Sequence, residues 1–268
     1  MKGLQYALLL LLIATSMVAY GQQIASYPDS INRKRLNQTI ITEAGTYLGG
    51  MAFLNYIWYK DDERVPFHFY NDGGGYLQMD KFGHAFAAYR ESYAAYHALR
   101  KAGVGKKKAL LYGGPIGFVF QAPIEVFDGI YEGWGFSWYD IAANAFGSAL
   151  FMIQEAAFDD QVFLMKFSYS PSGYPKYHST LGETPLESFF LDYNAHTYWL
   201  SGNLLKLTGI KTMPPWLNIA LCACGCKVHL AKTLDLNRNH NQHLSVSLCT
   251  RGSITNSAKR APFFSNDN

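Results

Sequence analysis

Three pairs of polar residues stand at helical spacing in the apolar middle of this 268-residue sequence. The pairs are Asp80 and His84, Glu125 and Asp128, and Asp140 and Asn144. Residues three or four positions apart share one face of a helix, so each pair can present two polar side chains together. Carboxylates in an apolar surface are costly unless they are paired, hydrogen-bonded or bound to a metal. We therefore expect the three pairs to face one another.

One histidine among several carboxylates is a donor set that suits a divalent ion. The candidate metal ligands are Asp80, His84, Glu125 and Asp128. With Asp140 they are also the candidate catalytic groups, because a bound ion can activate water and a carboxylate of raised pKa can act as a base. The candidate binding residues are Lys81, Asn144, Trp134 and Trp138. Of these, Lys81 would offset a phosphate or a developing anion.

Two other interpretations stay open. In the first, the same residues bind a lipid or cell-wall head group. In the second, they form a buried hydrogen-bond network that only fixes helix packing. Ser137 is a candidate helix N-cap, and it places Asp140 at a position where an acidic residue suits the helix dipole. Convergence of the three pairs on one accessible cleft would favour a site over a packing network.

The elements that must position these residues are helices. We predict a mainly α fold, a compact bundle of about five to six apolar helices with a small β portion near the C-terminus. Helices are predicted over residues 37–59, 80–101 and 109–127, and from Ser137 to about Phe158.

Proline and polar runs indicate the breaks between these helices. Gly113-Gly114-Pro115 and Pro123 are expected to interrupt the third helix, and Pro185 to start a further short one. Residues 158–184 are turn-rich, residues 26–36 are expected to form a solvated linker, and residues 192–201 fit either a strand or a helix.

The loop before Asp80 contains Asn71-Asp72-Gly73-Gly74-Gly75, a sequence that strongly favours a turn. It lacks the Gly-Lys-Ser/Thr that would follow in a phosphate-binding loop. We interpret it as a turn that could form a flap over the Asp80 face.

Residues 1–21 read as a signal peptide, with a lysine before a short apolar run and small residues before Gln22. The alternative is an uncleaved anchor in a membrane-embedded protein. No cysteine stands at the boundary, so no lipid-anchor signal is visible there. Residues 22–220 would form one helical envelope domain, periplasmic or envelope-associated.

The formal net charge of +3 gives no reason to expect nucleic acid. The expected partners are an envelope lipid, a cell-wall component or a membrane surface.

The tail, residues 221–268, differs from the rest of the chain. It holds all four cysteines, six basic and two acidic residues, and no Trp or Tyr. Our hypothesis is a frameshift near codon 221, with a disordered tail as the alternative. The spacing of Cys222, Cys224, Cys226 and His229 is not a common zinc pattern, and a disulfide is a further alternative.

The chain resembles an uncharacterised family of bacterial predicted periplasmic lipoproteins, a domain of unknown function. The matching stretches are residues 80–84, 133–144, 192–201 and 215–220. A weaker resemblance, to the VanZ-like membrane family, rests on Asp-Lys-x-x-His and on Asp140, Asn144 and Gly147. Both imply work in the cell envelope and neither implies a mechanism.

We therefore expect an exported cell-envelope protein with a polar Asp/His/Glu/Asn cluster between helices that binds a head group or a divalent metal. The alternatives are a metal-dependent envelope hydrolase and a purely structural, membrane-associated scaffold. The sequence does not decide whether the protein is an enzyme.

Overall fold

The structure is a computed structural model, and it describes residues 27–60, 62–73, 78–203, 227–233 and 243–248. The predicted signal peptide, residues 1–21, lies outside these described residues. The stretch at 215–220, the last of those that carry the family resemblance, lies outside them as well.

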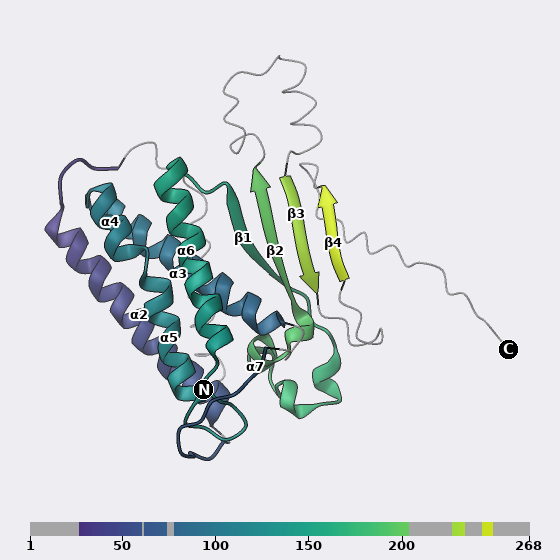
Figure 1. The fold of residues 1–268 in the computed structure, drawn as a ribbon. Helices are drawn as coiled ribbons and strands as arrows, with labels where there is room; N and C mark the ends of the chain where they lie inside the picture. The colour runs from purple at the N-terminus through teal and green to yellow at the C-terminus, as the bar shows by residue number, and fades with distance from the viewer. Residues whose placement is uncertain (1–26, 61, 74–77, 204–226, 234–242, 249–268) are drawn as a thin grey trace.

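Helices dominate the described part of the chain (Figure 1). They are α2 (Arg33–Tyr59), α3 (Met79–Lys101), α4 (Lys106–Gly113), α5 (Ile116–Asp128), α6 (Trp138–Phe158) and α7 (Pro185–Leu191). The strands are β1 (Phe163–Tyr169), β2 (His196–Asn203), β3 (Lys227–Thr233) and β4 (His243–Leu248). Short 3₁₀ turns cover Tyr174–Lys176, Ser179–Leu181 and Tyr193–Ala195. The prediction of a mainly α fold with a small β portion near the C-terminus is confirmed.

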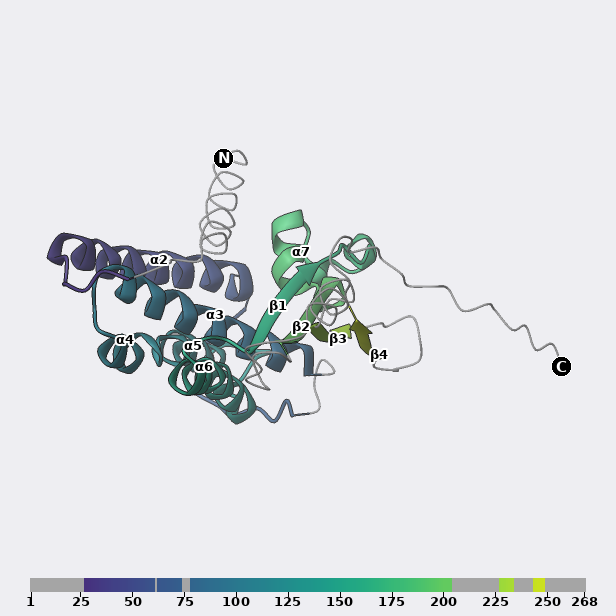
Figure 2. The same cartoon turned by 90° about the horizontal axis from the view of Figure 1, so that it is seen from above.

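Helix α3 lies at the centre of the bundle. It packs against α2, α4, α5 and α6 and also touches β1 and β2. Figure 2 shows α2 on one side of α3, and α5 and α6 on the opposite side. The buried core around it is aromatic, with Tyr89 and Tyr96 of α3 against Phe151 of α6. The position of α3 therefore governs what the other helices can present to it.

Two glycines let α5 and α6 approach the backbone of α3 closely. A Cβ added at Gly147 of α6 would lie 2.1 Å from the carbonyl oxygen of Ala85. A Cβ added at Gly117 of α5 would lie 1.9 Å from that of Ala88. Since glycine has no Cβ, the backbones can touch where any other residue would hold them apart.

The sheet is antiparallel throughout, in the order β1-β2-β3-β4. Phe163 of β1 pairs with Gly202 of β2, and Tyr89 of α3 donates a hydrogen bond to the Phe163 carbonyl. Strands β3 and β4 come from the atypical tail at 221–268. The rest of that tail lies outside the described residues, so the frameshift stays a prediction.

Three sequence expectations about local structure were wrong. Pro123 lies inside α5 and does not interrupt it, whereas the other predicted break, at Gly113–Pro115, does separate α4 from α5. A Gly-Gly-Pro run disfavours a continuous helix more strongly than a single proline does. The single proline here lies in a segment that packs against both α3 and α6. Arg33-Lys34-Arg35 forms the first turn of α2, with Asn32 as the N-cap, and is not a linker. The turn-rich stretch 158–184 contains strand β1.

Two predicted helix starts are confirmed. The Ser137 side chain accepts a hydrogen bond from the Asp140 amide at the start of α6. Pro185 begins α7, where Thr184 and Glu187 form a capping box. The ambiguous stretch 192–201 is a 3₁₀ turn followed by β2.

A buried acid inside the bundle makes the fold sensitive to pH. Glu91 of α3 accepts a hydrogen bond from Gln121 of α5 at 2.8 Å, and its second oxygen is buried without a hydrogen bond. Burial raises the pKa of Glu91 to about 8, above the ordinary value of 4.5. Below the ordinary value both folded and unfolded chains hold the proton. Between the two values only the folded chain does, so stability falls as the pH rises.

We expect Glu91→Gln to reduce the loss of stability that accompanies a rise in pH. The amide keeps the shape of the protonated acid and cannot ionise, so the variant should be more stable than the parent by about 1–2 kcal/mol near pH 8 and similar to it near pH 5. Urea unfolding at both pH values measures the difference. Glu132→Gln, at an exposed position, is the control. An equal effect of Glu91→Gln at both pH values would contradict the interpretation.

Candidate functional site

The structure brings the three sequence-predicted pairs together. Asp80 and His84 come from α3, Glu125 and Asp128 from α5, and Asp140 and Asn144 from α6. His84 is the common neighbour, lying 3.8 Å from Asp80, 3.5 Å from Glu125 and 4.0 Å from Asp140 between charged atoms. The close approach of α5 and α6 to α3 is what makes these separations short.

A buried lysine neutralises the outer part of this cluster. Lys81 is only 9% exposed, and its Nζ lies 3.0 Å from Asp80 Oδ2 and 2.8 Å from Asp140 Oδ1. The same ammonium group donates to Asp72, whose other oxygen accepts a hydrogen bond from Ser137 at 2.6 Å. One ammonium group thus joins the 62–73 loop, α3 and the start of α6.

The two ring nitrogens of His84 face different surroundings. Nδ1 lies 3.2 Å from Asn144 Oδ1 and 3.5 Å from Glu125 Oε1, on the inner side. Nε2 faces the carboxylates of Asp80 and Asp140. An amide oxygen can only accept, so contact with Asn144 favours a proton on Nδ1. Nε2 is therefore the nitrogen directed at the two aspartates.

Glu125 is buried without hydrogen bonds among the described residues. Its side chain is 0% exposed, and neither carboxyl oxygen has a hydrogen-bond partner. The Asn144 amide nitrogen beside it also lacks one. Buried polar groups normally find partners, so unpaired groups at this depth indicate either a strained site or a role that a further group completes.

Two tyrosines complete the site. Tyr59 of α2 donates a hydrogen bond to Asp128, and its ring stacks on Tyr131 with centroids 4.4 Å apart. Tyr193, from the turn before β2, donates to Asp80 Oδ1 at 2.8 Å. The cluster is therefore held by elements from both the bundle and the sheet region.

The pKa values of the cluster follow from burial and close charges. Burial alone would lower the pKa of His84, but Asp80, Glu125 and Asp140 outweigh it and raise the pKa to about 9. Burial raises the pKa of Glu125 to about 8, of Asp128 to about 7 and of Asp140 to about 6, although His84 opposes each shift.

Asp80 behaves differently from the other acids. Burial would raise its pKa, but the adjacent His84 and Lys81 charges hold it below the usual range. At neutral pH the cluster therefore pairs two cations with ionised Asp80, while Glu125 mostly keeps its proton.

The cluster opens into a pocket of about 300 Å³. Asp72, Asp80, His84, Asp128 and Asp140 form its polar wall. The remaining wall is largely aromatic and aliphatic, with Trp58, Tyr70, Ile124, Trp134, Leu181, Phe190, Leu191 and Tyr193. An apolar cavity with a few convergent polar groups is the usual form of a small-molecule site.

Of the two tryptophans predicted to bind a ligand, one lines this pocket and the other does not. Trp134 lines the pocket and donates a hydrogen bond to Asp62 at 2.7 Å. Trp138 lies outside it, is 65% exposed and packs against Phe69 and Phe136. As the first residue of α6, Trp138 points away from the side that carries Asp140 and Asn144.

Sequence reasoning missed three residues of the site, namely Tyr59, Asp72 and Tyr193. The Asn-Asp-Gly turn was interpreted as a flap over Asp80, and Asp72 does reach that face. Nothing in the turn indicated a partner for Lys81. Tyr59 and Tyr193 lie on other elements, and no spacing rule connects them with Asp128 or Asp80.

Asp80, His84 and Asp140 form a group that could hold a metal ion. One ligand atom from each lies within 4.8 Å of the others. Bonds of about 2.1 Å in tetrahedral geometry place ligand atoms about 3.4 Å apart. His84 Nε2 lies 3.8 Å from Asp80 Oδ1 and 4.0 Å from Asp140 Oδ1, a few tenths of an ångström more than this, and the two aspartate atoms lie within 4.8 Å of each other.

Comparison with known proteins identifies the region that carries this site. Residues 68–156 match a family model described as predicted periplasmic lipoprotein (DUF2279). The predicted family resemblance is confirmed. The DUF2279 match runs from the loop before α3 to the end of α6 and includes all three polar pairs. The description of that family is consistent with the predicted periplasmic or envelope-associated location.

Other comparisons add nothing to the DUF2279 match. No curated protein matches the chain, and no solved structure does. The VanZ-like resemblance receives no support.

Removing the buried ammonium group tests what holds the cluster. We expect Lys81→Met to lower the free energy of unfolding by about 3–5 kcal/mol, because three carboxylates lose their shared counter-charge. Urea unfolding at neutral pH measures this. Lys107→Met, at an exposed position of α4, should change stability by less than about 0.5 kcal/mol. Equal effects of the two substitutions would show that the Lys81 contacts contribute little.

Proposed function

We propose that this exported envelope protein binds a divalent cation through Asp80, His84 and Asp140, and that the cation holds an anionic group of a small envelope molecule in the pocket. The observation that carries the proposal is the division of the two His84 nitrogens. Nε2 faces the two aspartates, while Nδ1 faces Asn144 and the buried carboxyl of Glu125, which has no hydrogen bond.

This division is typical of histidines that bind metals. A metal-ligating imidazole usually passes its other N–H to a carboxylate or carbonyl oxygen, which fixes the ring and raises its basicity. Asn144 and Glu125 supply such oxygens here, from two different helices. A histidine that served only helix packing would not require a fully buried carboxyl behind it.

The composition of the site favours a borderline or hard ion. One imidazole with carboxylates suits Mn²⁺ or Zn²⁺, and no thiolate lies among these residues. Lys81 balances part of the charge of Asp72, Asp80 and Asp140. The aromatic wall of the pocket would then pack against the apolar part of a ligand whose anionic end meets the cation.

Metal titration of the purified full-length chain tests the proposal. We expect one Mn²⁺ or Zn²⁺ per chain by calorimetry and by elemental analysis after dialysis. We expect His84→Ala to weaken binding by at least about tenfold, because a ligand typically contributes 1.4 kcal/mol or more. Asp80→Asn should act in the same direction.

The control for losing a buried histidine is His196→Ala. His196 lies 2.8 Å from the Phe189 carbonyl in the sheet region, and its loss should leave metal affinity unchanged. If the parent protein binds neither ion, the proposal is wrong and the cluster is a packing network or an organic-ligand site. If His196→Ala weakens binding as much as His84→Ala, the loss reflects destabilisation.

A second candidate function is metal-dependent hydrolysis. Asp128 lies on the pocket wall, and burial raises its pKa to about 7, which suits a general base at neutral pH. A cation at Asp80, His84 and Asp140 would supply the Lewis acid in the same pocket.

Hydrolysis of p-nitrophenyl phosphate and p-nitrophenyl acetate in the presence of Mn²⁺ or Zn²⁺ tests this second function. We expect metal-dependent turnover of one of them and a fall in kcat of about a hundredfold in Asp128→Asn. Asp159→Asn, at an exposed position, should be unchanged. Turnover that survives chelation, or that Asp128→Asn leaves intact, would exclude this mechanism.

A further inference from the structure

Helix α6 has inverted polarity. Its polar residues are all buried, namely Asp140, Asn144, Ser148, Gln154 and Glu155. Its exposed residues are all aromatic, aliphatic or alanine, and the large ones are Trp138, Tyr139, Phe146, Ile153 and Phe158. A helix on the surface of a water-soluble protein normally shows the opposite pattern.

The neighbouring helices α4 and α5 repeat this pattern. From Ala109 to Asp128 the exposed residues are Leu111, Tyr112, Val119 and Val126. Tyr112, Val119 and Val126 recur every seven residues, as Tyr139, Phe146 and Ile153 do on α6. Positions seven apart lie on one side of a helix, so α5 and α6 each carry an apolar stripe, and Tyr112 of α4 precedes the stripe of α5.

These stripes lie on the same side of the molecule. Helices α5 and α6 pack against each other and against α3, and Figure 2 shows both on the side of α3 away from α2. Their outward faces therefore form one apolar surface, which we call the α5–α6 face. Phe69 stacks against Trp138 and extends this face toward the 62–73 loop. Apolar surface of this extent indicates a binding surface.

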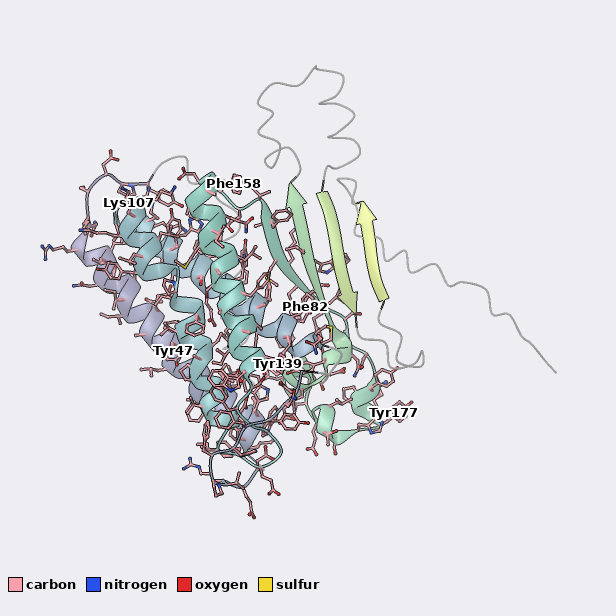
Figure 3. All side chains as sticks on the ribbon, viewed as in Figure 1. Tyr47, Phe82, Lys107, Tyr139, Phe158 and Tyr177 are labelled. Carbon is pink, nitrogen blue, oxygen red and sulfur yellow. The ribbon has the colours of Figure 1, made fainter. Side chains whose placement is uncertain are left out.

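The residues around the α5–α6 face suit a membrane. Trp138 and Tyr139 lie at one end, and such amphipathic rings favour the boundary between lipid and water. Lys106, Lys107 and Lys108 lie at the other end, near Phe158, as Figure 3 shows for Lys107, Phe158 and Tyr139. Lys106 pairs with Asp159 at this end, and the exposed ammonium groups of Lys107 and Lys108 would meet anionic lipid head groups.

Length and composition alone would allow Lys106–Asp128 and Trp138–Phe158 to cross a membrane. The arrangement of the sheet argues for a different placement. Strands β1 and β2 run beside α3 and α6 along the bundle (Figure 1). A bilayer crossed along the helix axes would also enclose the open sheet, and unpaired strand edges are not tolerated in hydrocarbon. Lying flat avoids this conflict.

We propose that the α5–α6 face lies on an anionic lipid bilayer, with the axes of both helices parallel to the membrane plane and the apolar stripes in the boundary between head groups and acyl chains. Helices with strong apolar faces commonly bind membranes in this way. The inference does not depend on the proposed metal site, because Asp80 and His84 lie on α3 and Asp140 is on the buried side of α6.

Vesicle sedimentation of the purified full-length chain tests the proposal. We expect binding to vesicles of phosphatidylcholine with about a quarter phosphatidylglycerol, and weaker binding to phosphatidylcholine alone. Ile153→Glu should weaken binding by about tenfold or more, because it places a charge in the apolar face. The matched control is Leu48→Glu. Leu48 of α2 is 67% exposed, against 65% for Ile153, and lies on the other side of α3.

Tryptophan fluorescence reports the orientation directly. Lipids brominated on the acyl chain should quench the protein when it is bound, and Trp138→Phe should remove most of that quenching. Trp138 is largely exposed, so this substitution should leave the melting temperature nearly unchanged.

Three results would overturn the proposal. The first is equal vesicle binding by Ile153→Glu and Leu48→Glu. The second is a dimer in solution that Ile153→Glu dissociates, which would mean that a second copy covers the face. The third is a protein that only detergent extracts from membranes and that does not bind added vesicles, which would indicate spanning helices.

Discussion

The arrangement of this protein depends on one buried ammonium group. Lys81 extends from the first turn of α3 between Asp72, Asp80 and Asp140, which come from a loop and two helices. Each of these carboxylates alone would be costly to bury, and so would the ammonium group. Together they fix the start of α6 against the start of α3. The Ser137 cap links the same network to the backbone of α6.

The buried polar residues and the exposed apolar residues of α6 follow from one orientation of this helix. The side of α6 that carries Asp140 and Asn144 faces α3, and the side that carries Phe146 and Ile153 faces outward. In a water-soluble helix the polar residues would solvate the outer surface. Here they are buried within the protein, where Asp140 and Asn144 lie beside His84 and Asp140 lines the pocket. An amphipathic helix can thus serve a polar site and an apolar surface at once.

Local periodicity made much of this predictable from the sequence. The pairs Asp80 and His84, and Asp140 and Asn144, follow helical spacing, and helix geometry alone brings their members onto one face. Tyr193 lies more than a hundred residues from Asp80, and no local rule connects the two. Strand β1 escaped prediction because Phe163–Tyr169 begins with three consecutive apolar residues and so lacks strict alternation of apolar and polar types. The orientation of Trp138 likewise depended on which side of the α6 N-terminus faces α3.

The contacts at Gly117 and Gly147 have a consequence for how the site tolerates change. The gap between α3 and its two neighbours is set by backbone atoms in contact, not by side chains that can adopt new rotamers. Exchanges among the apolar core residues can therefore be absorbed by local repacking while the separation of the ligand-bearing helices stays constant. A single methyl group at either glycine would instead push two helices apart as rigid bodies. How far the site tolerates substitution therefore depends on Gly117 and Gly147, two residues without a side chain.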